Sequence, residues 1–101
     1  MFTSLLCHRD VDIFKFNWFC SRVHLDRGFE IPHIIVSDGS LTDEDKIKLN
    51  ALPGVVVEEE PIVLHTGSNG ELVPKAPLLG KMQCLQRCFE NHGADRAVLF
   101  D

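Results

Sequence analysis

Hydrophobic residues gather in short runs that alternate with segments of helical periodicity. The runs span 2–7, 32–36, 54–57 and 97–100, and they contain no Lys, Arg, Asp or Glu. A continuous run of this kind is typical of a strand covered on both faces, as in a parallel sheet. The pattern therefore predicts four strands, and the segments between them are long enough for a helix or a loop.

The first intervening segment predicts a helix over 11–27. Its apolar residues recur near helical spacing, at Val11, Phe14, Trp18, Cys20 and Val23. Asp10 is a suitable N-cap and Gly28 a suitable residue just past the C-terminus.

Two more helices are expected. In 41–54, Thr42 and Asp45 form a capping-box pattern, and Pro53–Gly54 ends the helix. The third helix begins at Pro77 and ends at Gly93. Its expected buried stripe consists of Leu78, Met82, Leu85 and Phe89. Residues 61–76 are expected to be an irregular loop with a turn at 67–70.

The order strand, helix, strand, helix, strand, loop, helix, strand predicts an α/β domain of three layers. The sheet is expected to be mostly parallel and four-stranded, in the common order 3-2-1-4, with helices on its faces. We treat residues 1–101 as a single domain. In that order the topological switch point falls between the first and fourth strands, where ligands bind beside the strands' carboxyl ends.

Composition and charge narrow the function. The net charge is −5, and the ten basic residues are scattered, so a broad nucleic-acid surface is not expected. No stretch approaches the roughly 20 apolar residues of a membrane span, and no signal peptide is indicated. The four cysteines all fall in strand or helix patterns, which favours a reduced, cytoplasmic protein without disulfides.

Polar residues stand where three of the predicted strands end. His8, Arg9 and Asp10 follow the first strand, Asp38 follows the second, and Asp101 follows the fourth. Because the carboxyl ends of parallel strands meet at one edge of the sheet, these residues are expected to converge on one crevice.

The stretches "VSDGS" and "ADRAVLFD", with a lysine-bearing first turn of the third helix, resemble the N-terminal half of a GT-A type glycosyltransferase. In that family the fourth strand runs into an Asp-x-Asp motif, which binds Mn²⁺ or Mg²⁺ and through it the diphosphate of a nucleotide sugar. The resemblance implies that Asp101 is the motif's first aspartate and a metal ligand. It also implies nucleotide contacts from His8, Arg9, Asp10, Asp38 and Lys81. Carboxylates suit this chemistry because such cations prefer hard oxygen ligands.

Each of these residues also has a simpler interpretation. Asp38 with Gly39 suits a turn, Asp10 suits a helix cap, and Lys81 suits an exposed helix position. His8 and Arg9 equally suit a solvated loop. The hypothesis therefore depends on the joint placement of these residues at the strand ends.

Other chemistries are less well supported. Cys84, Cys88 and His92 are spaced four apart on one side of the third helix, but they lack zinc-finger spacing, and we interpret the cysteines as small core residues. Cys7 and His8 are adjacent on a strand and point to opposite faces, so they do not form a nucleophile–base pair. The chain has no GxGxxG and no Walker A motif. In haloacid-dehalogenase-type phosphatases the nucleophilic Asp follows the first strand, whereas Asp101 follows the fourth.

We expect a glycosyltransferase-like domain, cut within its Asp-x-Asp motif, with little or no transferase activity by itself. It would bind a nucleotide sugar and act on an unknown acceptor. The alternative is a small α/β domain that binds a partner or assembles with itself. An unpaired fourth strand favours a homo-oligomer under either hypothesis.

Overall fold

The protein is described by a computed structural model in which residues 1–59, 64–66, 70, 72–74 and 77–100 are placed. Its strands are β1 (Phe2–Leu6), β2 (His33–Ser37), β3 (Val55–Glu59), β4 (Leu64–Thr66), β5 (Leu72–Pro74) and β6 (Val98–Leu99). Its α-helices are α1 (Val11–Val23), α2 (Asp43–Asn50) and α3 (Pro77–Asn91). Short 3₁₀ helices cover His8–Asp10 and Gly28–Glu30. None of the described helices is both long and apolar enough to span a bilayer.

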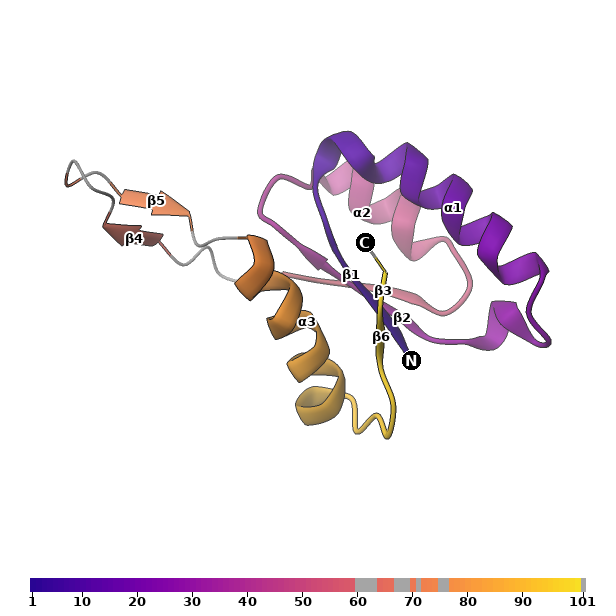
Figure 1. Cartoon of the computed structure of the whole chain (residues 1–101). Coiled ribbons are helices and arrows are strands. Elements are labelled where there is room, and N and C mark those ends of the chain that lie inside the picture. The colour runs from indigo at the N-terminus through magenta and orange to yellow at the C-terminus, as the bar shows by residue number, and fades with distance from the viewer. Residues whose placement is uncertain (60–63, 67–69, 71, 75–76, 101) are drawn as a thin grey trace.

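The main sheet confirms the predicted fold class. Its four strands lie in the order β3-β2-β1-β6, which is the order 3-2-1-4, and every neighbouring pair is parallel. Figure 1 shows α1 and α2 on one face of this sheet and α3 on the other. The switch point therefore falls between β1 and β6, as the sequence predicted.

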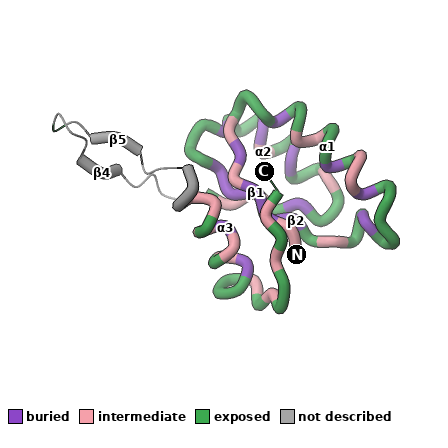
Figure 2. Tube along the Cα trace, viewed as in Figure 1, coloured by how far each residue is buried: buried purple, intermediate pink, exposed green. Residues whose placement is uncertain are grey.

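The core lies mainly between the sheet and the pair α1 and α2 (Figure 2). Every residue of β2 is buried, as expected for a strand covered on both faces. Ile35 of β2 and Leu49 of α2 are fully buried in this cluster. The other buried members are Leu6, Val11, Trp18, Leu41 and Val55.

The second helix follows the sequence closely. Thr42 Oγ1 accepts a hydrogen bond from the Asp45 N–H (3.1 Å), and Asp45 Oδ2 accepts one from the Thr42 N–H (3.0 Å). This is the predicted capping box, which satisfies two amide groups that the first helical turn leaves without partners.

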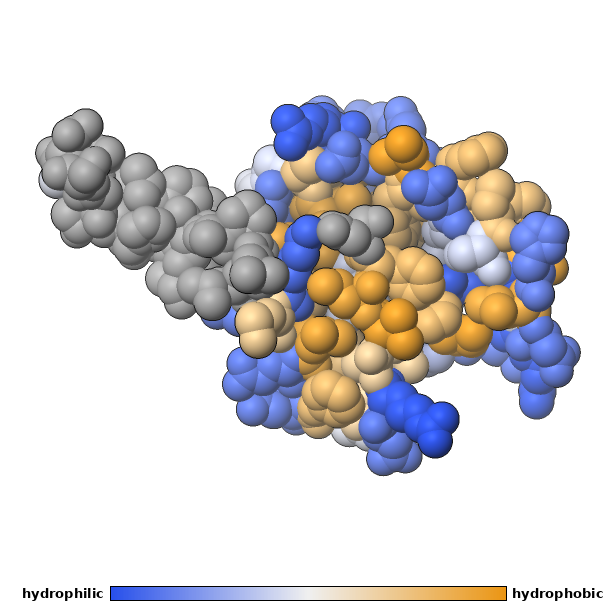
Figure 3. Space-filling view, in the orientation of Figure 1, coloured by the Kyte–Doolittle hydropathy of each residue, from blue (hydrophilic) through white to orange (hydrophobic). Residues whose placement is uncertain are grey.

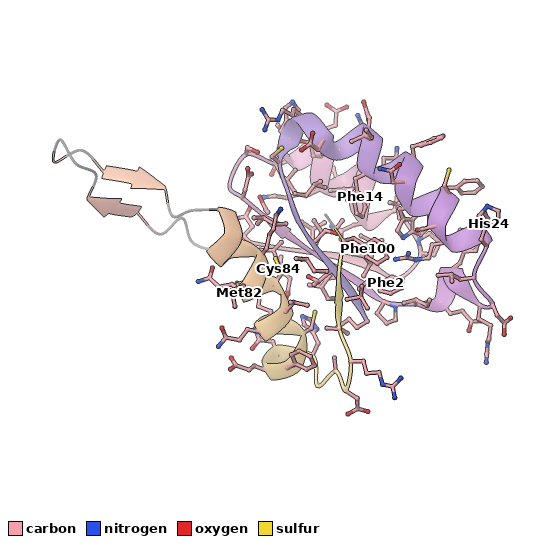
Figure 4. All side chains as sticks on the ribbon, in the orientation of Figure 1. Phe2, Phe14, His24, Met82, Cys84 and Phe100 are labelled. Carbon is pink, nitrogen blue, oxygen red and sulfur yellow. The ribbon has the colours of Figure 1, made fainter. Side chains whose placement is uncertain are left out.

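The third helix begins at Pro77 as predicted, but its expected buried stripe is wrong at Met82 and Phe89, while Leu85 is half-buried and the burial of Leu78 is not described. Met82 and Phe89 are about half exposed, whereas Cys84 and Cys88 are fully buried. Figure 4 shows Cys84 directed toward the sheet and Met82 directed away from it. The small cysteine side chains let α3 approach the sheet closely, so the interpretation of both cysteines as core residues is confirmed.

The first helix ends earlier than expected, at Val23 rather than near Arg27. Gly28 does not end this helix; it begins the second 3₁₀ helix and lies against the backbone of Arg22. A Cβ on Gly28 would lie 2.2 Å from the Arg22 carbonyl oxygen, so the chain turns back here only because this residue has no side chain. The apolar face expected for α1 was also wrong at its C-terminal end, because Arg22 is buried while Val23 is 44% exposed.

The segment expected to be irregular contains a hairpin. Strands β4 and β5 pair antiparallel, with His65 opposite Val73, and Figure 1 shows the hairpin projecting from the body of the domain. Each strand has three residues, which is too short for an alternating pattern to be recognised in the sequence.

Candidate functional site

The carboxyl ends of β1 and β2 are joined by side chains, as the parallel topology predicted. The His8 backbone N–H donates to Ser40 Oγ (2.9 Å). The same hydroxyl donates to Asp38 Oδ1 (2.6 Å), which also accepts from the Ser40 N–H (2.9 Å). His8 and Asp38 therefore belong to one connected group, which we call the strand-end cluster: His8, Asp38, Ser40 and Asp45.

Asp45 holds the His8 ring in place. Its Oδ2 lies 2.5 Å from His8 Nδ1, and its side chain is 7% exposed, against 59% for His8. The hydrogen bond from His8, together with the one from the Thr42 N–H, lowers the pKa of the Asp45 carboxyl. Because an ionised carboxylate only accepts hydrogen bonds, the proton of this pair lies on Nδ1, and Nε2 is the nitrogen that can meet a ligand.

The simpler interpretations hold in part for the aspartates. Asp38 does make the turn contacts expected of Asp, and both of its hydrogen bonds with Ser40 use Oδ1. Asp10 occupies the N-cap position of α1 without capping it, because its carboxylate Oδ2 accepts instead from the Cys7 thiol (3.0 Å). The predicted role of Asp10 as a side-chain cap is therefore wrong.

The remaining predicted residues divide between three places. Arg9 lies between His8 and Asp10 in the first 3₁₀ helix and is exposed, so it borders the cluster. Lys81 lies near the start of α3, which covers the other face of the sheet (Figure 1). Asp101 lies outside the described residues.

No metal site is evident in the part of the chain that the structure describes, where no group of three or more His, Cys, Asp or Glu is arranged to hold an ion. His92 of the Cys84–Cys88–His92 stripe instead pairs through Nε2 with Glu58 Oε1 (2.9 Å). The proposed ligand of Mn²⁺ or Mg²⁺, Asp101, lies outside the described residues.

A second group of polar side chains lies beneath α1, and the sequence analysis missed it. Arg22 is 1% exposed and His33 is 2% exposed. Arg22 Nη2 donates to His33 Nδ1 (2.9 Å), and His33 Nε2 lies 2.8 Å from Ser4 Oγ. The spacing along the helix could have indicated that Arg22 is buried, because Arg22 follows Trp18 by four residues and so lies on the same helix face.

Burial determines the charge state of this second group. Desolvation, with a smaller contribution from the Arg22 guanidinium, lowers the pKa of His33 to about 3. His33 is therefore neutral near pH 7. Since its Nδ1 accepts from Arg22, its proton lies on Nε2, which donates to Ser4.

No protein-family model, no curated protein and no solved structure matches the chain. The assignment of function therefore depends on the geometry of the two groups of side chains.

Proposed function

We propose that this chain is the nucleotide-binding part of a GT-A type glycosyltransferase, and that the strand-end cluster contacts a nucleotide sugar. The observation that carries the proposal is the junction of His8 with Asp38 through Ser40, beside the switch point of a parallel sheet. Open α/β sheets bind ligands at this position.

The cluster has groups suited to the parts of a nucleotide. The free Oδ2 of Asp38 suits the hydroxyl groups of a ribose, since Oδ1 already serves the turn. The exposed guanidinium of Arg9 suits a phosphate, which it can bind through paired hydrogen bonds. His8 presents Nε2 from a ring that Asp45 fixes, so little side-chain entropy is lost when a ligand binds.

Transfer of a sugar to an acceptor needs groups that lie outside the described residues, including the proposed metal ligand Asp101. We therefore expect binding of a nucleotide without turnover from this chain. The nucleotide sugar, the unknown acceptor and the cation, Mn²⁺ or Mg²⁺, stay part of the proposal.

The test is a titration of ¹⁵N-labelled protein with uridine and guanosine diphosphates and their sugars, with Mg²⁺ present. Amide shifts should gather at 7–10 and 37–41. The variant D38N keeps the size of the side chain and should weaken binding about tenfold, because a hydrogen bond to a charged group is lost. The matched control is D95N, which removes an exposed carboxylate elsewhere and should bind like the wild type.

Absence of nucleotide binding, or binding that D38N leaves unchanged, would contradict the proposal. It would favour the second candidate, a domain that assembles with itself. That candidate is supported by the sheet edge, because Val98 of β6 and the following Phe100 are 49% and 36% exposed. Figure 3 shows hydrophobic side chains gathered around this strand. Sedimentation velocity on the same samples would then show a concentration-dependent dimer or larger oligomer.

A further inference from the structure

A cavity of about 280 Å³ lies between α1 and the β1–β6 side of the sheet. Its walls are largely apolar and aromatic, and Figure 4 shows Phe14 and Phe100 facing this space from different elements. The residues that matter for its chemistry are Leu6, Phe14, Trp18, Arg22, His33 and Phe100.

Arg22 brings a buried positive charge to this cavity. Its guanidinium carbon lies 4.3 Å from the centre of the Phe2 ring and 5.7 Å from that of Phe100. Arg22 donates hydrogen bonds to Ser21 Oγ (3.0 Å) and to His33 Nδ1 (2.9 Å). A guanidinium has five N–H donors, and the buried Nε of Arg22 has no partner among the residues that the structure describes.

The charge of Arg22 is not balanced by its neighbours among the described residues. Ser21 is neutral, and His33 is neutral because burial depresses its pKa. The one carboxylate that lines the cavity is Asp10, which lies twelve residues before Arg22 along the chain, at the far end of α1. At 1.5 Å per helical residue that is about 18 Å away, well beyond the length of an ion pair.

Trp18 adds a second unused donor on the same helix face. Its side chain is buried and lines the same cavity, and its Nε1–H has no hydrogen-bond partner in the described part of the chain. Trp18 precedes Arg22 by one helical turn, so the two donors lie one above the other on α1. Buried donors without partners are uncommon in folded proteins, and two that meet at one cavity suggest an acceptor that is not part of the described chain.

We propose that this cavity binds a small organic anion, a carboxylate with a compact apolar body, whose oxygens accept hydrogen bonds from Arg22 and Trp18. A carboxylate matches the planar guanidinium, and its apolar body would contact the aromatic wall. The volume suits a small ligand, since a cavity of about 150 Å³ already holds benzene. This inference does not depend on the proposed nucleotide site, which lies at the ends of the strands.

The chain supplies its own probe, because Trp18 is its one tryptophan. Benzoate and 3-phenylpropanoate, each with its neutral primary amide, would be titrated while Trp18 fluorescence and the single indole N–H resonance are followed. We expect the carboxylates to bind at least tenfold more tightly than the amides and to shift the indole resonance. Equal affinity of acid and amide, or no response to either, would overturn the proposal. So would inorganic phosphate binding as tightly as benzoate, because the apolar body would then contribute nothing.

The variant R22M removes the charge and keeps an apolar side chain of similar length. It should lose the preference for the carboxylate over the amide, while R96M, which changes an exposed arginine, should keep it. Retention of the preference in R22M would also overturn the proposal. If R22M does not fold, the comparison of acid and amide on the wild-type chain decides by itself. D38N should bind benzoate like the wild type, which separates this cavity from the nucleotide site.

Discussion

The buried imidazole of His33 makes the stability of the protein depend on pH in a specific range. His33 lies under α1, where Phe14 packs edge-on against its ring at 5.1 Å between centroids, and both of its nitrogens are occupied by Arg22 and Ser4. Protonation would place a second positive charge beside Arg22 and would remove the lone pair that accepts from it. The folded state therefore resists protonation until the pH is near 3.

The sign follows from comparing the two states. The pKa of His33 is about 3 in the folded protein and 6.5 in the unfolded chain, so between these values the unfolded chain binds more protons. The contribution of His33 to stability is complete above pH 6.5 and is lost as the pH falls toward 3. Between pH 7 and pH 5 the free energy of unfolding should fall by about 2 kcal/mol. Most carboxyl groups are still ionised in this interval, so they contribute little to the change.

The assay is urea unfolding at pH 7, 6 and 5, followed by circular dichroism. The variant H33Q offers an amide oxygen to Arg22 and an amide N–H to Ser4, but it does not titrate. It should be less stable at pH 7 and should lose most of the fall of about 2 kcal/mol. The control H24Q removes an exposed imidazole just past the C-terminal end of α1 and should keep that fall (Figure 4). A wild type whose stability is flat from pH 7 to 5, or an H33Q variant that retains the full fall, would refute the reasoning.

Two predictions concern single turns of the chain. T42A removes the N-cap hydroxyl of α2 and should lower the free energy of unfolding, measured with urea, by about 1 kcal/mol. T42S keeps a hydroxyl and should lower it by less. Equal stability of T42A and the wild type would show that the capping box is not formed. G28A should lower the free energy of unfolding by about 3 kcal/mol, because the new Cβ would lie 2.2 Å from the Arg22 carbonyl oxygen. G93A, where the glycine has a φ of +62° in open space, should lower it by only about 1 kcal/mol, and a reversed order of the two glycine variants would contradict this account.

Much of the fold could be predicted because its strongest patterns are local. The apolar residues 34–36 at the centre of β2 indicated a strand covered on both faces, and the strand–helix alternation then indicated a parallel sheet. The prediction was wrong where a pattern was short or ambiguous. Strands β4 and β5 have three residues each, and on α3 the long side chain of Met82 was a stronger apolar signal than the two cysteines that are actually buried.

The candidate site was predicted only as far as topology determines it. The meeting of His8 with Asp38 follows from the parallel order of β1 and β2. Asp45 was missed because its capping role already accounted for it, although the same carboxylate also holds His8. Arg22 was missed because a charged residue near a helix end is usually solvated. His33 lay within the predicted buried strand, but its hydrogen bond to Arg22 depends on the packing of α1 against β2.

Asp45 and Arg22 are both buried ionisable side chains, but they differ in how the fold stabilises their charge. The Asp45 carboxylate accepts hydrogen bonds from His8 and from the N–H of the N-cap residue Thr42, and these bonds favour its ionised form. Ser21 and His33, the hydrogen-bond partners of Arg22, are neutral, and burial lowers the pKa of Arg22. Desolvation of its charge therefore destabilises the fold, because no opposing charge lies beside it among the described residues. An anion in the cavity would relieve that penalty and would bind the folded state alone, so at a hundred times its dissociation constant it would add about 2.7 kcal/mol of stability. The anion would also offset the repulsion between Arg22 and a protonated His33, so ligand binding and the acid sensitivity of the domain act on the same pair of side chains.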